Sequence, residues 1–359
     1  MKKKALIAMS GGVDSSVAAY LMNEKGFECI GATMKLYQNE QLNVSKEHTC
    51  CSLDDVEDAR NVAISMGMPH YVFNFSERFN EEVIEKFIKA YENGITPNPC
   101  IECNRHLKFE YLYNRAKELG YNYVVTGHYS IIEYSDEMKR YILRKAVDPT
   151  KDQSYVLYSM TQDMLAHTLF PLGGMTKTQV REIALEHNFV NAAKHDSQDI
   201  CFVPEGKYAD FIENYTKKQY PEGDFVDTNG NVLGKHKGII RYTVGQRKGL
   251  GLSLNQPMYV KNVCPEDNTV ILSTNEELFS TSLDANDINL ITVDEITKPL
   301  RVKAKVRYKH EEQWATVTQT SEDTIHVEFD EPQRAITKGQ AVVLYDGDIV
   351  VGGGTIFNI

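Results

Sequence analysis

A short apolar run followed by two glycines, close to the N-terminus, constrains the fold more than any other part of this chain. Residues 5–9 contain no polar side chain, which predicts a strand buried on both faces of a parallel sheet. Gly11 and Gly12 then allow a tight turn. From Val13 the apolar residues recur at helical spacing until Gly26, where the helix is expected to end. The N–H groups at the start of such a helix form an anion-binding site.

Strand-like and helix-like segments alternate after this turn. Predicted strands cover residues 29–34, 69–73 and 123–128, and predicted helices cover residues 53–66 and 77–91. This alternation predicts an α/β fold built on a doubly wound parallel sheet, whose ligand site lies at the carboxyl ends of the strands. Met34 and Gly127 fall at that edge. A glycine there either admits a nucleotide close to the backbone or serves only as a turn.

Composition limits the class of protein. The chain has 359 residues, of which 42% are hydrophobic, enough for two or three domains. Apolar runs are shorter than the ~18 residues that a membrane span needs. The N-terminus passes from three lysines into a strand without the pattern of a secretory signal. We therefore expect a cytoplasmic protein with no membrane partner, whose seven cysteines are catalytic or metal-binding rather than bridging.

Charge is segregated along the sequence. The net charge of −11 argues against a nucleic-acid partner, but residues 228–265 and 296–310 each contain six bases and no acid. Within the second window, residues 301–309 alternate basic and apolar side chains, which predicts a strand with one basic face. Such a face is usually only solvated. Because both windows lack acids, we favour contact with an RNA backbone.

Two cysteine-containing segments are candidates for chemistry. Prolines at 97 and 99 exclude a helix before Cys100, so Cys103 is expected near a helix start, where the helix dipole lowers a thiol pKa. A structural zinc site would need further ligands at similar spacing, and a thioredoxin-like dithiol needs a different sheet context. The interpretation that remains is a reactive thiol working with another cysteine. Cys201 follows the polar run 195–199, which is typical of a surface or cleft.

The segment Ser-Gly-Gly-Val-Asp-Ser-Ser at 10–16 resembles the pyrophosphatase loop of enzymes that adenylate a substrate and release pyrophosphate. It is not a Walker A loop, because Gly-Lys-Ser/Thr does not follow at the required spacing. Asp14 is unusual in an anion site, since a carboxylate repels phosphate unless a metal ion or backbone amides offset its charge.

The chain as a whole resembles the bacterial tRNA-specific 2-thiouridylases of the pyrophosphatase-loop superfamily, which place sulfur on the wobble uridine of certain tRNAs. The resemblance implies ATP and Mg²⁺ as cofactors, tRNA as substrate, and a cysteine desulfurase or sulfur-relay protein as donor. It runs almost end to end, over residues 10–16, 96–104, 127–129, 151–155, 196–202, 243–252 and 339–354.

The resemblance also implies roles for individual residues. The nucleophile would be Cys103, and Cys201 would carry a persulfide; no metal ligand is assigned. ATP would contact Ala8, Met9, Ser10, Gly11, Gly12, Val13, Asp14, Ser15, Met34 and Gly127. The target base would meet Asn98, Pro99 and Cys100, and other parts of the tRNA would meet His128, Lys151, Asp152, Gln153, Arg307, Tyr308 and Gln340.

Three domains are expected: a catalytic pyrophosphatase-loop domain over 1–206, a small β-rich domain contacting tRNA over 207–278, and a C-terminal β-barrel over 279–359. In the implied reaction ATP adenylates the O2 oxygen of uracil, and sulfur comes from a Cys201 persulfide. Cys103 either forms a disulfide with Cys201 or attacks the base, and the sequence leaves both routes open.

Three other interpretations stay open. Some members of the family carry aspartate where this chain has Cys100, so Cys100 is not expected to be indispensable for persulfide chemistry. It would instead supply a third thiolate if Cys100, Cys103 and Cys201 bind an iron–sulfur cluster. The chain would otherwise be a pyrophosphatase-loop ligase acting on a small acid or amide, or a tRNA-binding module without activity.

Overall fold

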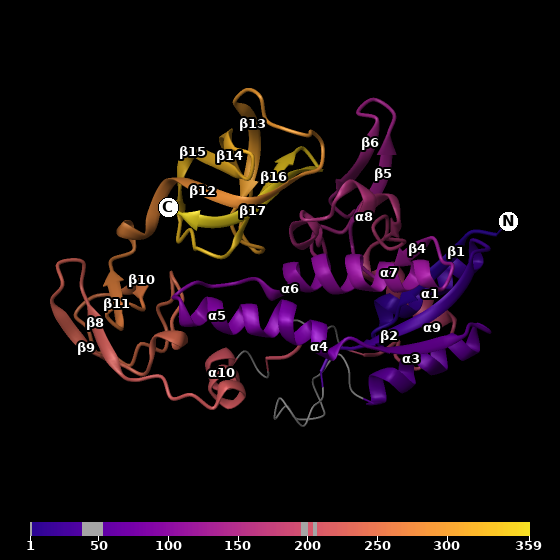
Figure 1. The fold of residues 1–359 in the computed structure, drawn as a ribbon, viewed down its shortest axis with the longest axis horizontal. Coiled ribbons are helices and arrows are strands. Elements are labelled where there is room, and N and C mark those ends of the chain that lie inside the picture. Colours follow the sequence, from indigo (N-terminus) through magenta and orange to yellow (C-terminus); the bar gives the residue numbers. More distant parts are fainter. Residues whose placement is uncertain (1, 38–52, 195–199, 204–206) are drawn as a thin grey trace. The chain divides into compact units, whose positions relative to one another are not determined.

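The computed structural model describes residues 2–37, 53–194, 200–203 and 207–359. The chain forms two compact units (Figure 1). The first unit contains residues 1–83, 100–206 and 348–350, and the second contains residues 84–99, 207–347 and 351–359. This division is not the three-domain division expected from the sequence, whose boundaries stay a prediction.

A five-stranded sheet forms the centre of the first unit. Its strands lie in the order β3-β2-β1-β4-β7, and all four neighbouring pairs are parallel. The parallel sheet predicted from the strand–helix alternation is therefore confirmed. The strands are β1 (Lys4–Ala8), β2 (Glu28–Lys35), β3 (His70–Asn74), β4 (Tyr123–Val125) and β7 (Thr168–Leu169).

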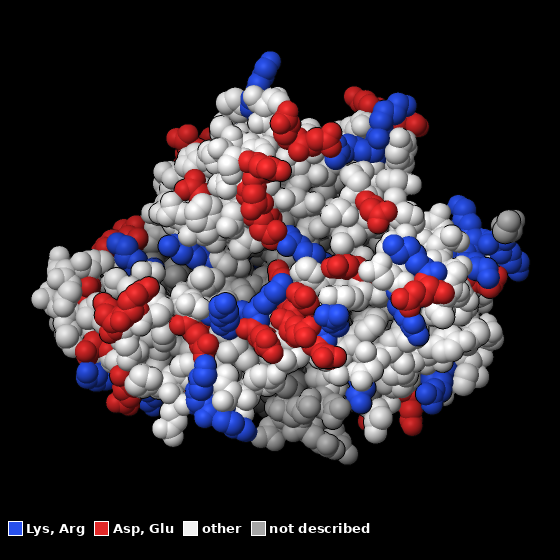
Figure 2. All heavy atoms as spheres, in the orientation of Figure 1, with Lys and Arg blue, Asp and Glu red and all other residues white. Residues whose placement is uncertain are grey.

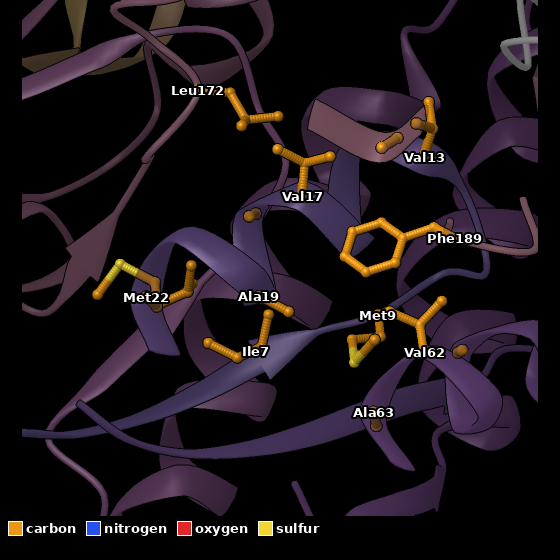
Figure 3. Close-up of a cluster of buried hydrophobic side chains, with 14 of the residues drawn as sticks. Ile7, Met9, Val13, Val17, Ala19, Met22, Val62, Ala63, Leu172 and Phe189 are labelled. Atoms are coloured by element: carbon orange, nitrogen blue, oxygen red, sulfur yellow. The ribbon is translucent and has the colours of Figure 1, made fainter. Parts of the chain in front are cut away.

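Both faces of β1 are buried, as its uninterrupted apolar run predicts. Ile7 is fully buried in a cluster with Val17 and Met22 of helix α1, which Figure 3 shows above the strand. Leu6, pointing to the opposite face, is fully buried in a second cluster with Leu112. Successive side chains of a strand point to opposite faces, so a strand covered on both sides has no polar position.

Helices cover this sheet. The expected helix after the glycine turn is α1 (Val13–Glu24), and Gly26 beyond its end has a φ of +77°, which favours glycine. In the described part of this unit, the other helical segments include α3 (Leu53–Ser65), α4 (Ser76–Phe79), α6 (Pro99–Glu102), the π-helix η2 (Cys103–Tyr111), α7 (Leu112–Glu118), the short turn η3 (Ser154–Leu157), α8 (Gln162–Ala166) and α9 (Lys177–Glu186). The hairpin β5 (Ile131–Ser135) and β6 (Arg140–Arg144) also belongs to it.

Two helical stretches contain π-helical turns, which the apolar spacing does not predict. The helix expected at 77–91 continues from α4 through the π-helix η1 (Asn80–Glu85) into α5 (Lys86–Glu92). The stretch with the cysteine pair starts at Pro99, one residue earlier than predicted, because a proline is tolerated in the first helical position. Cys103 then lies at the start of η2, in a class of turn that is frequent at functional sites.

The second unit is mainly β-structure. A four-stranded sheet in the order β10-β11-β8-β9 follows helix α10 (Tyr208–Thr216) in the chain. Its strands are β8 (Gly223–Val226), β9 (Val232–His236), β10 (Tyr259–Cys264) and β11 (Thr269–Ser273). Two short turns, η5 (Ile239–Arg241) and η6 (Glu276–Leu278), also lie in this part of the chain. β12 (Phe279–Leu290) pairs with both β15 (Thr324–Arg334) and β17 (Ile349–Asn358). This pairing closes the predicted C-terminal barrel, whose other strands are β13 (Leu300–Lys305), β14 (Gln313–Ser321) and β16 (Ala341–Asp346).

In the described part of the chain, none of the helices has the length and apolar character needed to cross a membrane.

Candidate functional site

The glycine loop between β1 and α1 has the geometry of an anion site. Gly11 has a φ of +75°, and a Cβ atom there would lie 2.4 Å from the carbonyl oxygen of Asp55, so only glycine fits. The Ser10 N–H donates to Ser15 Oγ at 3.2 Å, and Ser15 Oγ–H donates to the Gly12 carbonyl at 2.9 Å. These two hydrogen bonds fix the conformation of the loop between Ser10 and Ser15. The first N–H groups of α1 have no acceptor within the helix and are available for an anion.

The carboxylate of Asp14 is paired with a lysine that the sequence analysis did not select. Lys177 Nζ lies 2.8 Å from each of the two Asp14 carboxylate oxygens, and the Tyr129 hydroxyl donates to Asp14 Oδ1 at 2.7 Å. Lys177 is the first residue of α9, and its N–H donates to Asp148 Oδ2 at 3.0 Å. The ammonium group therefore offsets the Asp14 charge that would repel phosphate.

A second lysine anchors the back of the loop. Lys194 Nζ lies 2.6 Å from Asp55 Oδ1 and 2.8 Å from Asp58 Oδ2. Burial lowers the pKa of Lys194, but the two carboxylates outweigh burial and leave that pKa above its ordinary value. Asn191 Nδ2 donates to the Gly11 carbonyl and to Ser16 Oγ, both at 2.9 Å. The loop is thus fixed from helix α3 and from the segment after α9.

Gly127 and Met34 lie where the sheet edge was expected to bring them. A Cβ atom on Gly127 would lie 2.8 Å from the Asp14 carbonyl carbon and 2.9 Å from the Ser15 nitrogen. Met34, on β2, packs with Ala8 of β1 against the cluster that contains Leu112. A glycine is therefore needed at position 127 because the backbone lies close to the loop, whether or not a nucleotide also approaches it. The ATP contacts of these residues stay a prediction.

The three cysteines of interest differ in exposure. Cys103 is only 9% exposed, Cys100 is exposed and Cys201 is half-buried. The Cys201 carbonyl accepts a hydrogen bond from the Tyr37 hydroxyl at 2.8 Å, and the next residue, Phe202, is buried. Cys201 is therefore attached to the first unit, whereas the polar run 195–199 before it lies outside the described residues.

The iron–sulfur interpretation requires three thiolates to lie close enough together to bind one cluster. Across residues 2–37, 53–194, 200–203 and 207–359, no group of three or more His, Cys, Asp or Glu side chains is arranged to hold a metal ion. Cys100, Cys103 and Cys201 all belong to those residues. The three-thiolate interpretation stays open.

Two of the residues expected to contact tRNA, His128 and Gln153, make hydrogen bonds within the first unit, and their contacts with tRNA stay a prediction. His128 is buried against Phe170, with Nδ1 2.6 Å from Thr126 Oγ1. Burial, with a smaller effect of nearby Lys108, holds the pKa of His128 well below its ordinary value.

Gln153 Oε1 accepts the Tyr129 N–H at 2.9 Å and so holds the residue whose hydroxyl meets Asp14. The neighbouring Asp152 accepts the N–H of Ala146 at 2.9 Å. Contacts of the segment 151–153 with tRNA stay a prediction.

In the second unit, Arg307 and Gln340 make hydrogen bonds to backbone carbonyls. Arg307 Nη2 donates to the carbonyls of Val244 at 2.9 Å and Ala335 at 3.0 Å, and also to Thr337 Oγ1. Gln340 Nε2 donates to carbonyls in the segment 96–97. Tyr308, the other expected tRNA contact, is exposed, with Lys305 Nζ 5.8 Å from the centre of its ring.

The alternating strand is confirmed over residues 301–305 only, because β13 ends at Lys305 and residues 306–309 form bends and turns, and its acid-free surroundings are not confirmed. Val302 and Ala304 of β13 are buried and Arg301 is exposed, as predicted. Arg301, however, forms an ion pair with Asp330 of β15, a strand outside the basic window. Figure 2 shows acidic side chains among the basic ones on the face in view.

Bases in the other window also find acids from elsewhere. Lys235 pairs with Asp224, Arg241 with Asp210 and Glu213, and Lys261 with Glu277. A stretch of sequence that contains no acids can therefore still have acidic side chains from other segments beside it on the surface. In the described structure Arg247 and Lys248 are exposed and no ion pair is recorded for either.

Comparisons with known proteins identify the family. Residues 3–205 match the model of a tRNA methyl transferase HUP domain, 209–274 that of a tRNA methyl transferase PRC-barrel domain, and 280–356 that of an aminomethyltransferase beta-barrel domain. A protein named tRNA-specific 2-thiouridylase MnmA, from Clostridioides difficile (strain 630), is 54% identical over 356 residues, covering 99% of this chain and 98% of that protein. This chain belongs to the tRNA-specific 2-thiouridylase family.

Another 2-thiouridylase of the family, from Acetivibrio thermocellus, is 52% identical over 99% of both chains. Membership in the thiouridylase family confirms the resemblance inferred from the sequence motifs, and the three matched models agree with a parallel-sheet domain followed by β-domains. Among solved structures, a 4-thiouridine synthetase in complex with RNA and ATP is 19% identical, covers 60% of this chain and 51% of its own, and has a TM-score of 0.38, which is too low to support a conclusion.

Proposed function

We propose that this chain is an ATP-dependent tRNA-uridine 2-sulfurtransferase, which replaces the O2 oxygen of the wobble uridine with sulfur and releases AMP and pyrophosphate. The observation that carries the proposal is the ion pair of Asp14 with Lys177 at the glycine loop. It supplies a cation to an anion site that lacks the Walker lysine. Full-length similarity to proteins named 2-thiouridylases supports the choice of substrate.

The residues around the loop fit ATP with Mg²⁺. Gly11 admits no side chain, and the N–H groups at the start of α1 are suited to the pyrophosphate portion. Asp14 would hold Mg²⁺, which when bound neutralises charge on the phosphates. Lys177, whose ammonium group lies beside the loop, would donate to the pyrophosphate oxygens as they gain charge.

Activation converts the uracil oxygen into a leaving group. The O2 atom attacks the α-phosphorus of ATP, the bond between the α- and β-phosphates breaks, and pyrophosphate leaves. The resulting O2–AMP bond makes C2 susceptible to a sulfur nucleophile, which then displaces AMP together with the original oxygen.

Sulfur delivery uses the two cysteines. A cysteine desulfurase or a sulfur-relay protein would transfer sulfur to the Cys201 thiolate, giving a persulfide. The Cys103 thiolate then attacks the inner sulfur of Cys201, which forms a Cys103–Cys201 disulfide and releases hydrosulfide to attack C2. An external dithiol must reduce this disulfide before the next turnover. Such a cycle fits a reducing cytoplasm.

The proposal is tested by analysing the nucleotide products and the modified tRNA of one reaction. The chain is incubated with a tRNA transcript containing the wobble uridine, a cysteine desulfurase with cysteine, and ATP labelled at the α- or γ-phosphate. We expect AMP, pyrophosphate and 2-thiouridine, with no 2-thiouridine when ATP is omitted. Thiolation without ATP, or ADP and orthophosphate as the only nucleotide products, would contradict the proposal. ATP cleavage with a small acid or amide in place of tRNA would favour the ligase interpretation.

A further inference from the structure

Two segments of the second unit that are distant in sequence are joined by hydrogen bonds through the backbone of Thr96. The Thr96 N–H donates to the Lys338 carbonyl at 3.0 Å. Gln340 Nε2 donates to the Thr96 carbonyl at 2.9 Å and to the Pro97 carbonyl at 3.2 Å. Both backbone polar groups of Thr96 are therefore engaged by the segment 338–340, and a single side-chain amide holds two successive carbonyls.

The two segments approach as closely as their backbones allow. Gly339 has a φ of +86°, and a Cβ atom there would lie 2.3 Å from Ile95 Cγ2 and 3.0 Å from the Thr96 carbonyl oxygen. Any side chain at position 339 would strain the backbone and push the segments apart. A glycine followed by glutamine is thus the combination that this contact requires.

The segment 338–340 is itself fixed to the barrel. The Gly339 N–H donates to the Ile356 carbonyl of β17, and the Ile356 N–H donates back to the Gln340 carbonyl, both at 2.8 Å. The turn just before it is held by Arg307, which donates to Ala335 and Thr337. The barrel therefore offers Thr96 a rigid support.

We propose that Gln340 is a positioning residue for the loop expected to meet the target base. This inference rests on the proposed function. Only Asn98 separates Pro97 from Pro99, where the helix that carries Cys103 begins. The rings of the two prolines fix their φ angles, so few free torsions lie between the held carbonyls and the helix start. Holding Thr96 and Pro97 therefore limits the directions that the chain can take through Asn98 to Pro99.

This role differs from a direct contact of Gln340 with tRNA, and the two have different consequences. A residue that binds tRNA contributes to tRNA affinity, whereas one that positions the loop contributes to the rate of thiolation once tRNA is bound. A displacement of about 1 Å in a catalytic group costs up to about 100-fold in rate.

The test compares Gln340→Ala, Gln340→Asn and the control Gln333→Ala, which alters a glutamine of β15 whose recorded hydrogen bond is to the Glu331 carbonyl. Single-turnover thiolation is measured at saturating tRNA, tRNA affinity by filter binding, and protection of the Thr96 N–H by hydrogen exchange without tRNA. We expect Gln340→Ala to slow thiolation by about 10- to 100-fold, with tRNA affinity within about twofold and faster exchange at Thr96. Gln340→Asn, whose amide is one methylene shorter, should behave similarly, and Gln333→Ala should match the original chain.

Two results would overturn the proposal. One is weaker tRNA binding with an unchanged rate at saturation, which assigns Gln340 to tRNA contact. The other is unchanged Thr96 exchange in both Gln340 variants. If Gln340→Ala does not fold, the Gln340→Asn variant decides. If the original chain makes no 2-thiouridine, the proposed function fails, but the exchange measurement still tests whether Gln340 holds Thr96.

Discussion

Lys177 and Asp14 form an ion pair in which the ammonium nitrogen is 2.8 Å from both carboxylate oxygens, although 163 residues separate them in the chain. The side chain of Lys177 is 11% exposed and that of Asp14 is 30% exposed, so the pair lies partly out of water. Partly out of water, the positive charge of Lys177 neutralises the negative charge of Asp14 beside the anion site. The loop and α9 together make the site.

Removal of the Lys177 ammonium group should lower the rate of ATP cleavage while the chain still folds. For Lys177→Met we expect tRNA-dependent AMP formation to fall by about 100-fold or more, because a preorganised cation at developing charge has an effect of that size. Lys25→Met, at an exposed lysine just after α1, is the control and should cleave ATP normally. AMP formation by Lys177→Met at the normal rate would show that Lys177 serves only to neutralise Asp14.

The local parts of this site could be predicted from the sequence. The apolar run, the glycine pair and the helical spacing from Val13 depend on neighbours in the chain, and they led to β1, the turn and α1. The partner of Asp14 could not be predicted, because nothing in the capping box at Thr176 and Gln179 shows which loop α9 faces. Similarly, no periodicity indicates that helix η2 has π-helical turns.

The two basic windows also show that contacts between distant segments cannot be predicted from the sequence of one segment. The alternation of residues 301–309 predicted a strand with a basic and an apolar face, and this is correct as far as Lys305, where β13 ends, because alternation is a property of one strand. The acids that neutralise Arg301 and Lys235 belong to other strands, and strand pairing decides which charges meet. Sequence windows therefore predict the face of a strand better than the net charge of a surface.

Two exposed bases of the second unit, Arg247 and Lys248, give a prediction for tRNA binding. Replacing Arg247 and Lys248 together by methionine should weaken tRNA binding and reduce the slope of log affinity against log salt by nearly two, as expected for two phosphate contacts. The control replaces Lys235 and Lys261, which already pair with Asp224 and Glu277. Equal slopes for the two double variants would contradict a specific role of Arg247 and Lys248.

The cysteines should separate by role when they are changed one at a time. Cys201→Ser should fail to accept radiolabelled sulfur from a desulfurase, whereas Cys103→Ser should accept it and form no 2-thiouridine. Cys100→Ser should keep substantial activity, because the proposed sulfur transfer uses only the other two thiols. Loss of iron and of activity together in all three variants would instead support the cluster interpretation. Normal labelling of Cys201→Ser beside none in Cys103→Ser would reverse the two roles.

His128 should make the stability of the first unit depend on pH. Burial, with a smaller effect of Lys108, keeps its pKa in the folded state below the ordinary value of 6.5, so below that pH the unfolded chain binds more protons. Stability should therefore fall as pH drops below 6.5, by at most about 1.4 kcal/mol per pH unit from this group. The destabilisation caused by His128→Gln, measured by urea denaturation, should then be smaller at pH 5.5 than at pH 7.5. An equal cost at both pH values would contradict the buried neutral histidine.

The path of one oxygen atom tests the central claim, that ATP activates the uracil oxygen which sulfur replaces. A tRNA is prepared with ¹⁸O at O2 of the wobble uridine and is thiolated by the chain with unlabelled ATP, and the released AMP is analysed by mass spectrometry. The account predicts one ¹⁸O atom in AMP for each 2-thiouridine formed, because O2 attacks the α-phosphorus and leaves with it. AMP without ¹⁸O, formed together with 2-thiouridine, would contradict the account.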